Sequence, residues 1–439
     1  MKLNLKKISY CLYTASFFLS HLSANNPNFY KAPNLYSRST SCRFDNEEHY
    51  NVKTGYTKLD ITYSYGSTRS AWKHSGGSTS LLNTTGNQNM LYLFENVKKL
   101  PSIDDFTTFL GAAQINHSKT NNTFGQLEFG GKFTVHDLEI NLRQNLTSGF
   151  FAELIVPLKK VEVKNIHYID KSPEAGLFSQ NTWEWKQFKN NLNAILNNFG
   201  LRDYNTPYSA SDMGDLNAII GWHDFLTQDK DNDVQTSLEL KAGVICPTGH
   251  DGDSSWIFDP STGHNNHWGI NFLGELSLTY KDWLTFNLHA STNFFFDKTK
   301  TKNMKTFNKQ NGPIKLGQGN AKEEKGLFWH VGLDAKADHF IEGLSAWIGY
   351  SYNRQEADFL WPEDTFYFNS TTVNNDTALA ASYVNVLHLM LDYDFSVHMQ
   401  NSIWAPLLSA FYNYPFSGRN IFKTATIGAG LGFDIRWNF

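Results

Sequence analysis

Residues 427–439, IGAGLGFDIRWNF, alternate almost without error between apolar residues and residues that are polar or glycine. A period of two places the apolar set on one face of a β-strand and the other set on the opposite face. A strand of this kind faces an apolar environment on one side only. The pattern therefore predicts a β-strand at the end of the chain, with its apolar face turned either to a core or to lipid.

The end of this strand carries a second signal. The chain finishes on an aromatic residue, Phe439, and Trp437 stands two positions earlier on the same face. This combination resembles the C-terminal signal strand of bacterial outer-membrane β-barrels, which the barrel assembly machinery reads. The resemblance implies that machinery as a partner, with Phe433, Ile435, Trp437 and Phe439 as the assembly signal.

The N-terminus is typical of an exported protein. Lys2, Lys6 and Lys7 form a basic region, residues 8–22 are mostly apolar, and Ser23-Ala24 supplies small residues for cleavage. Residues 1–24 are therefore predicted to be a cleaved secretory signal peptide. A membrane anchor is disfavoured because polar residues interrupt a run that is already too short to span a bilayer as a helix. The polar, Asn-rich residues 25–52 are expected to form a periplasmic N-terminal segment.

Composition favours a membrane β-barrel over a soluble protein. The 439 residues are 15% aromatic, as interfacial girdles of aromatic side chains require. No later stretch is long enough for a membrane helix, and barrel strands are individually too polar to appear as one. A net charge of −4 argues against nucleic-acid binding. Cys42 and Cys246 are expected near opposite ends of the barrel, so no disulfide is predicted.

Apolar alternation recurs along residues 53–439, which are predicted to form a single outer-membrane β-barrel. Eleven segments carry it: 59–65, 127–142, 150–158, 216–222, 238–244, 270–278, 284–296, 327–335, 344–352, 387–393 and 427–439. A twelfth, 403–414, is apolar on both faces, so its orientation stays ambiguous. Most of these segments have the length and the half-apolar character of barrel strands.

The connections between these segments alternate in length. Short ones fall at 147–149, 227–232, 281–282, 340–343 and 395–398, and long ones at 67–122, 167–211, 248–265, 298–326 and 357–379. Short periplasmic turns and long extracellular loops are the rule for these barrels. The alternation predicts an all-β fold of about 12 antiparallel strands, provided that 124–146 is one strand with a bulge at His136-Asp137. A hairpin there would favour 14 strands.

Two of the long loops contain helical patterns. Large apolar residues recur at helical spacing across 182–200, and Ser102 can cap a short helix within 88–110. One or both helices are expected either to fold into the pore as a constriction, plug or gate, or to cap its rim or lie at the lipid interface.

The residues between the apolar positions would line the lumen, because charges facing lipid at mid-membrane cost about 2–4 kcal/mol for Lys or Arg. A hydrated, mutually neutralised network explains most of them, and a role in pore selectivity is the functional alternative. Their mixed signs argue against a dedicated anion porin. The candidates are Lys58, Asp60, Glu139, Arg143, Glu239, Lys241, Glu275, His289, His330, Asp334, Lys336, His388, Asp392, Asp434 and Arg436.

No convincing catalytic or cofactor site is present. His289-Ala290-Ser291 repeats the His-x-Ser spacing of outer-membrane phospholipase barrels, but its parity points the pair inward, away from lipid. The His and Asp residues of 250–267 are too loosely spaced to predict a metal site. The sequence therefore predicts a non-enzyme without a cofactor or bound metal, whose partners are outer-membrane lipid and a small-molecule solute.

Two short motifs carry a family resemblance. Gly214-Asp215 opens one predicted strand, and Pro247-Thr248-Gly249 ends the next. This arrangement resembles the outer-membrane barrels associated with phenol degradation, which are more distantly similar to the long-chain fatty-acid channels. The resemblance covers mainly 212–249 and implies a passive channel for small compounds, hydrophobic ones among the candidates. Physically, glycine permits a tight entry and proline ends the hydrogen-bonded ladder. The long inserts at 67–122 and 298–326 depart from the family.

Two functions remain open at this point. The first is a porin-like transporter of the bacterial outer membrane, its lumen narrowed by loop 67–122 or 167–211. The alternative is a non-conducting surface barrel that acts as an adhesin or a structural outer-membrane protein through its long loops.

Overall fold

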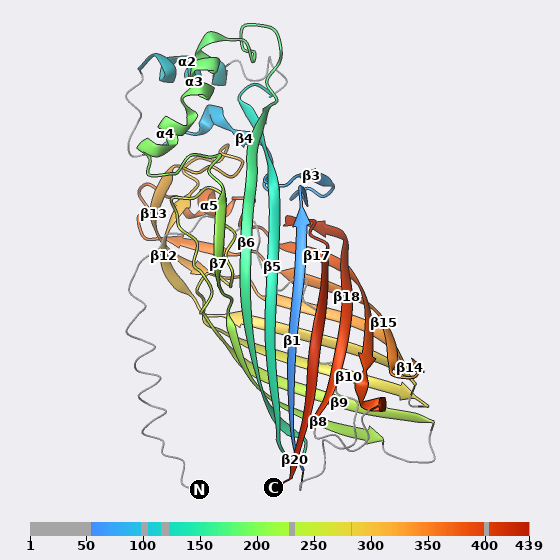
Figure 1. Cartoon of the computed structure of the whole chain (residues 1–439). Coiled ribbons are helices and arrows are strands. Elements are labelled where there is room, and N and C mark those ends of the chain that lie inside the picture. The colour runs from blue at the N-terminus through green and yellow to red at the C-terminus, as the bar shows by residue number, and fades with distance from the viewer. Residues whose placement is uncertain are drawn as a thin grey trace.

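Twelve long strands close into one antiparallel ring (Figure 1). The computed structural model describes residues 54–97, 104–115, 123–227, 233–281, 283–398 and 404–438. The ring order is β5-β1-β20-β18-β17-β15-β14-β11-β10-β9-β8-β6, and β6 pairs back onto β5. Among the described residues the prediction of 12 strands is thus confirmed, and the alternative of 14 is wrong. Their bounds are β1 (Thr54–Thr68), β5 (Gln126–Thr147), β6 (Phe150–Asp170), β8 (Leu216–Thr227), β9 (Val234–Cys246), β10 (Gly269–Tyr280), β11 (Leu284–Phe295), β14 (Phe328–Ile341), β15 (Leu344–Gln355), β17 (Ser382–Asp394), β18 (Trp404–Arg419) and β20 (Thr426–Asn438).

Several predictions fall outside the described residues. These are the signal peptide, the N-terminal segment with Cys42, and the terminal residue Phe439. The backbone of Trp437 pairs with Gly55 in the β1–β20 ladder, and Phe433 pairs with Leu59. Recognition of this strand by the barrel assembly machinery stays a prediction.

Strand β5 lacks the bulge that the sequence predicts. The segment 124–146 is one strand, as expected, but it has no bulge at His136-Asp137. Both residues keep regular partners, since Tyr65 lies opposite His136 and Ser64 opposite Asp137. The register of β5 against β6 shifts only at Gly130/Lys132 and at Asn145/Thr147. The change of parity in the sequence must therefore reflect a change in what the two faces of the strand contact.

The apolar face of the wall changes sides at one level, which we call the boundary. On the short-turn side, Leu142 of β5 is exposed on the outer surface, while Arg143 is buried inside. On the long-loop side, Phe133 and Val135 are buried on the inner face. Strand β6 switches at the same height, because Val161 lies opposite Val135. One continuous strand thus passes from an apolar exterior to an apolar interior.

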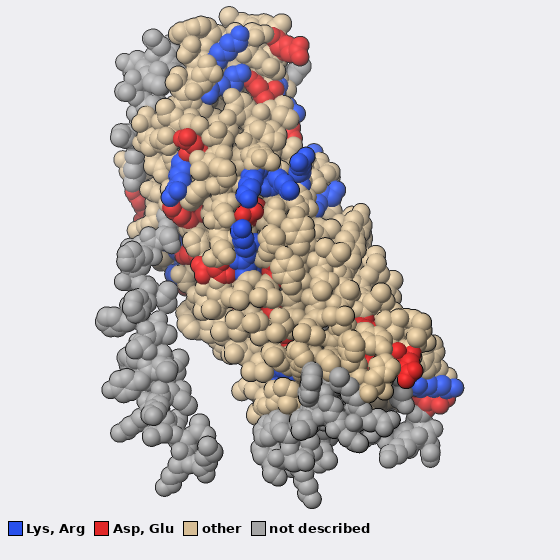
Figure 2. Space-filling model, in the orientation of Figure 1, with Lys and Arg blue, Asp and Glu red and all other residues tan. Residues whose placement is uncertain are grey.

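Below the boundary the barrel exposes a continuous apolar belt. Ile220, Leu288, Leu333 and Leu391, from four different strands, are 63%, 52%, 56% and 52% exposed. Figure 2 shows this part of the wall almost free of charged side chains. An apolar surface of this extent is foreign to soluble monomers but is what lipid-facing barrel walls present. Within the residues that the structure describes, none of the helices is long and apolar enough to cross a membrane.

Above the boundary, the long connections build a second body, which we call the cap (residues 69–97, 104–115, 171–207, 247–268, 296–327 and 356–381). Its apolar core is rich in aromatic side chains, including Phe124, Phe129, Phe133, Trp185 and Phe422 from the cap and the upper wall. The elements of the cap and the rim are β2 (Ser70–Trp72), β3 (Ser78–Ser80), β4 (Gln88–Asn89), η3 (Met90–Tyr92), α2 (Asp104–Ile115), α3 (Trp183–Asn190), α4 (Leu192–Asn198), β7 (Tyr208–Met213), β12 (Lys298–Met304), β13 (Gly317–Glu324), β16 (Phe359–Pro362), α5 (Ser370–Asn374) and β19 (Ile421–Phe422); η5 (Phe395–His398) lies at the opposite end.

The predicted loop helices belong to the cap. The pattern at 182–200 forms two helices, α3 and α4, and the other predicted helix is α2, with Ser102 outside the described residues. Helices α2 and α3 lie at the top of the molecule, above β5 and β6, and α4 lies below them, beside the upper end of β6 (Figure 1). Trp185, Phe188 and Leu192 are buried in the apolar core of the cap. Of the two expectations, the structure therefore favours helices that cover the rim over helices inserted at the level of the belt.

Candidate functional site: the barrel lumen and its cap

Inside the belt, side chains from distant strands form an ion network. Arg143 of β5 lies 3.0 Å from Glu239 of β9, and Lys241 lies 3.0 Å from Glu239 and 2.8 Å from Glu153. The Arg143 guanidinium carbon also stands 3.4 Å above the centre of the Phe151 ring. All of these residues are buried, and a buried charge is tolerated when it is paired in this way.

A second cluster occupies the inner face of β11 and β14. The rings of His289 and His330 stack with their centres 4.8 Å apart, and His289 Nδ1 lies 3.6 Å from Asp334. Asn287 donates a hydrogen bond to the same carboxylate at 2.8 Å. A cavity of about 20 Å³ adjoins these side chains, which is room for about one water molecule. Gly332 is required here, because a Cβ would lie 2.2 Å from His289 Nε2.

A third cluster joins β15, β17 and β18. His388 Nδ1 is 2.8 Å from the side-chain oxygen of Asn413, and His388 Nε2 is 2.7 Å from Ser351 Oγ. The amide oxygen can only accept, so Nδ1 carries the proton and donates it. Four residues along β15 from Ser351, Trp347 Nε1 donates a hydrogen bond to the Asp392 carboxylate at 2.6 Å. These bonds fix the orientation of both predicted lumen residues.

The remaining predicted lumen residues are placed as follows. Lys58 and Asp60 are buried on β1, Glu275 is buried on β10 opposite Glu239, and Lys336 is buried beside Asp338 at 2.7 Å. Glu139 and Asp434 are half-buried, and Arg436 pairs through its backbone with Tyr56. All but Arg436, whose side chain lies outside the description, share the face opposite the exposed apolar residues. Their use as a selectivity filter stays a prediction.

The structure offers no metal centre in the part of the chain that it describes. No group of three or more His, Cys, Asp or Glu side chains there is arranged to hold a metal ion. His289 of the His-x-Ser pair is buried inside the barrel.

The sequence reading missed a buried basic cluster within the insert 298–326. Strand β12 alternates Lys298, Lys300 and Lys302 with threonines, and Lys300 and Lys302 are buried while Thr299 is exposed. Further along the insert, Lys305, Lys315 and Lys325 are also buried. The alternation Lys-Thr-Lys-Thr-Lys has the period of a β-strand. A search for strands by alternating apolar residues does not detect it, because the buried face of this strand is basic.

Carboxylates compensate part of this charge. Glu323 lies 2.7 Å from Lys302 and 2.9 Å from His267 Nε2. Burial alone would raise the pKa of Glu323, but Lys302 and His267 outweigh it and hold that pKa well below its usual range. Burial lowers the pKa of His267 despite this carboxylate. Burial also lowers the pKa of Lys300 to about 8, although Glu323 and Asp251 oppose the shift.

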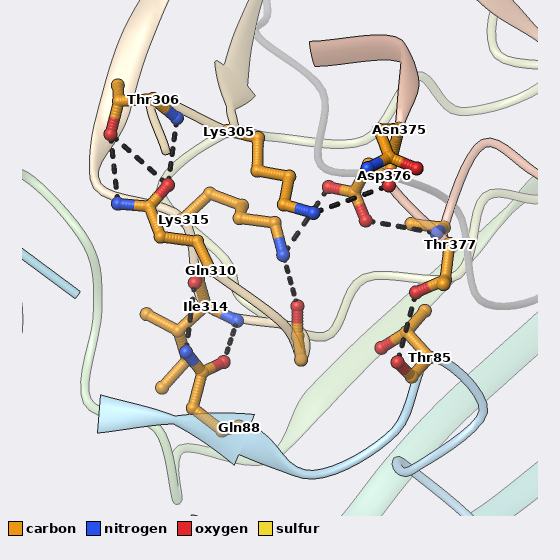
Figure 3. Close-up of polar contacts among 12 residues, drawn as sticks. Thr85, Gln88, Lys305, Thr306, Gln310, Ile314, Lys315, Asn375, Asp376 and Thr377 are labelled. Atoms are coloured by element: carbon orange, nitrogen blue, oxygen red, sulfur yellow. Dashed lines mark hydrogen bonds and ion pairs between the residues drawn. The ribbon is translucent and has the colours of Figure 1, made fainter. Parts of the chain in front are cut away.

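Hydrogen bonds and an ion pair between side chains connect three segments of the cap, residues 85–88, 305–315 and 375–377, which we call the interlocked segments (Figure 3). Gln88 accepts a hydrogen bond from the backbone N–H of Ile314 at 2.6 Å, and its amide nitrogen donates to the Ile314 carbonyl at 3.3 Å. Lys315 pairs with Asp376 at 3.4 Å, and Thr377 donates to the Thr85 carbonyl at 3.0 Å. The Gln88–Ile314 and Thr85–Thr377 contacts join segments that are more than 200 residues apart in the chain, and the Lys315–Asp376 pair ties the second of these segments to the third.

One of the interlocked segments, 305–315, borders a cavity of about 230 Å³. Its lining combines Phe199, Leu316 and Phe368 with polar residues such as Asn198 and Thr306. Gln310 supports this wall, since its side-chain oxygen accepts from the Thr306 N–H at 2.8 Å and its amide donates to the Tyr92 carbonyl at 3.0 Å. The cavity offers both apolar surface and hydrogen-bonding groups to a small molecule.

The two motifs that carry the family resemblance meet in space. Asp215 is buried and accepts from the backbone N–H groups of Gly249, at 3.0 Å, and His264, and also contacts His264 Nδ1 at 2.8 Å. Thr248 Oγ1 donates to the Gly214 carbonyl at 2.6 Å. Although burial favours the neutral acid, these bonds from His264 and Gly249 lower the pKa of Asp215. The motif residues therefore anchor loop 247–265 to the rim, a structural role.

No known protein family and no curated protein matches the chain. Among solved structures, an outer-membrane channel from Pseudomonas putida F1 is similar at 12% identity and a TM-score of 0.47, over 90% of this chain and 100% of that one. A Pseudomonas aeruginosa FadL homologue is similar at 10% identity and a TM-score of 0.28, over 96% of this chain and 100% of that one. The P. putida toluene transporter TodX is similar at 8% identity and a TM-score of 0.32, over 94% and 96% of the two chains. The distant similarity to FadL-type proteins predicted from the sequence is found here as a similarity of fold alone. The closed ring of this chain follows from its own strand register.

Proposed function

We propose that the protein is a channel of a bacterial outer membrane, exported through a cleaved signal peptide, for the passive movement of small solutes that include hydrophobic ones. The observation that carries the proposal is the reversal of faces at the boundary. A polar, charge-paired interior lies at the level of the lipid-facing belt, and an apolar, aromatic-rich cap lies above it. The short turns would lie in the periplasm and the cap outside the cell.

A solute that passes through the protein would meet two environments one after the other, first the cap cavity and then the lumen. The cap cavity of about 230 Å³ has apolar and polar lining and suits a small amphipathic molecule. The lumen beneath it is narrow, because barrel diameter grows with strand number and side chains fill small barrels. Passage therefore requires the interlocked cap segments to move apart, which makes contacts such as those of Gln88 and Gln310 the gate.

A swelling assay with proteoliposomes tests this proposal. The solutes should be uncharged and graded in size and hydrophobicity. The double variant Gln88→Ala/Gln310→Ala loosens the cap, and Lys322→Gln, an exposed residue on the outer side of β13, is the matched control. We expect swelling with the wild type, faster swelling with the double variant, and no change with the control. Absence of swelling with all three proteins would contradict a channel.

A non-conducting surface barrel is the second candidate. The observation that favours it is the continuous apolar core of the cap, which joins 34 buried side chains of the described part of the chain above the lumen. Under this function the outer surface of the cap would be the working part, and loosening its contacts would change stability without producing flux.

A further inference from the structure

The outer wall just above the boundary carries a group of basic side chains. At the boundary itself, Tyr63 and Tyr65 are exposed on β1, and the Tyr63 hydroxyl lies 2.7 Å from His136 Nδ1 on β5. Tyrosines at this position mark the interface between lipid tails and head groups. The side chains that follow directly above them on the outer face therefore stand at the height of the head groups.

Three cations of this group lie side by side, two on the adjacent strands β5 and β6 and one directly after β1. Lys132 of β5 lies opposite Lys164 of β6. Arg69 follows Thr68, the residue of β1 that lies opposite Phe133, so the register brings Arg69 beside Lys132. Lys164 and Arg69 are exposed, and Lys132 is half-exposed.

Two more cations extend the group along the small sheet of β2, β3 and β19. Lys423 follows β19, its ammonium lies 4.9 Å from the centre of the Trp72 ring, and its backbone N–H donates to the Ser70 carbonyl at 3.0 Å. Lys73 follows Trp72 at the end of β2 and is exposed. We call Arg69, Lys73, Lys132, Lys164 and Lys423 the basic patch.

The basic patch has an excess of positive charge. The segments 69–80 and 417–425 contain no Asp or Glu. Among the described residues, the carboxylate paired with the patch is Glu162, which lies 2.8 Å from Lys164. Elsewhere on the upper wall, exposed cations have partners of their own, as in Lys322–Asp297 at 2.7 Å and Arg354–Glu356 at 2.9 Å. Figure 2 shows basic side chains gathered over the upper parts of β5 and β6 and the region of β3, above the uncharged wall.

We propose that the basic patch binds the phosphate groups of phosphorylated lipids in the leaflet that surrounds the cap end of the barrel. The proposal rests on the placement of the belt in the membrane, which belongs to the proposed function. Phosphate groups attract Lys and Arg both by charge and by charge-assisted hydrogen bonds. The patch combines this chemistry with a fixed height directly above the belt, so that acyl chains lie on the apolar wall while the phosphates reach the cations. A phosphate-bearing lipid would thus bind along one side of the barrel.

Native mass spectrometry of the full chain in a neutral detergent tests this proposal. The probes are diphosphoryl lipid A, monophosphoryl lipid A and phosphatidylcholine, each added at the same concentration. The test variant is Lys73→Gln/Lys132→Gln/Lys423→Gln. The control variant, Lys186→Gln/Lys309→Gln/Lys322→Gln, removes the same charge from exposed positions of the cap outside the basic patch.

We expect the wild type to retain diphosphoryl lipid A most strongly and phosphatidylcholine least. A lysine near an anionic lipid surface contributes roughly fivefold to binding, so the test variant should retain diphosphoryl lipid A at least about tenfold more weakly, and the control variant should match the wild type. Added salt should weaken retention. Equal retention of the three lipids, or equal losses in the two variants, would overturn the proposal.

Inorganic phosphate separates a lipid site from a site for a free anion. Displacement of the lipid by millimolar phosphate would assign the basic patch to a free anion and overturn the lipid proposal, whereas persistence of the lipid supports it. The swelling assay on the same test variant keeps the two proposals distinct. The variant should swell like the wild type, because none of its three positions lies in the lumen or the gate, and a loss of lipid retention alone then concerns the basic patch alone.

Discussion

Two arginine substitutions on the outer face of β5 should have opposite consequences. Leu142 is exposed below the boundary, and Thr134 lies on the same outer face above it. The outer positions of β5 from Leu138 to Leu146 are apolar except for Gln144. Eight residue steps of about 3.4 Å give about 27 Å along the strand, or about 21 Å of height at a tilt near 40°. That height is close to the roughly 25 Å apolar band of membrane barrels, and Leu142 lies at its middle.

The expected loss of folding free energy depends on how deep in the bilayer the new arginine lies. An arginine on the lipid face costs about 2–4 kcal/mol at the bilayer midplane and about 0–1 kcal/mol near the interface. Leu142→Arg should therefore lower the folding equilibrium constant by roughly 30- to 1,000-fold, and Thr134→Arg by less than about tenfold. A third variant, Val135→Arg, faces inward above the boundary, where it would place an unpaired charge in the apolar core of the cap and cost more than about 3 kcal/mol.

Equilibrium unfolding from lipid vesicles in urea, followed by tryptophan fluorescence and by the gel mobility of unheated samples, measures all three free energies. The expected order of damage is small for Thr134→Arg and large for the other two. Equal costs for Leu142→Arg and Thr134→Arg would show that the boundary does not mark the edge of the lipid, and a harmless Val135→Arg would show that the faces do not exchange.

Three further results are expected. Leu288→Arg should impair folding into membranes more than Asn287→Arg, because Leu288 is exposed on the belt while Asn287 faces Asp334 inside; equal damage in a vesicle-folding assay would mean that the parity is wrong. Glu323→Gln leaves the buried Lys302 ammonium without its carboxylate and should cost about 3–5 kcal/mol of cap stability, visible as faster proteolysis of the cap and disproved by an unchanged digestion rate. Burial lowers the pKa of Lys300 to about 8, so the unfolded chain binds the extra proton between about pH 8 and pH 10.4. Stability should then rise with pH across that window, and Lys300→Met should remove the rise in thermal unfolding curves.

Much of the fold could be predicted because periodicity and loop length are local properties. The alternation across residues 427–439 and the alternating loop lengths lead to a barrel of 12 strands, and the strand register confirms it. The change of parity near His136 predicts a bulge, since a bulge is the local irregularity that exchanges the two faces of a strand. In the structure the strand is regular, and its surroundings change instead. A single sequence does not reveal where the lipid ends and an apolar core begins.

The partners within the lumen could not be predicted, because they depend on closure of the ring. Arg143 and Glu239 are 96 residues apart and meet only across the interior. Parity placed both on the inner face, but it carries no information on which inner residue lies across from which. The buried lysines of β12 were missed for a related reason: their carboxylate partner Glu323 comes from β13, and only the pairing of the two strands explains why such a strand is stable.

Single-channel conductance in planar bilayers tests the central claim most directly. The refolded wild type and the variant Gln88→Ala/Gln310→Ala should be compared at neutral pH in simple salt. A channel closed by an interlocked cap predicts discrete conductance steps in the wild type, and steps that are larger or more frequent in the variant. Correctly folded barrels that stay silent in both forms would contradict the channel and favour a surface barrel whose cap is the functional part.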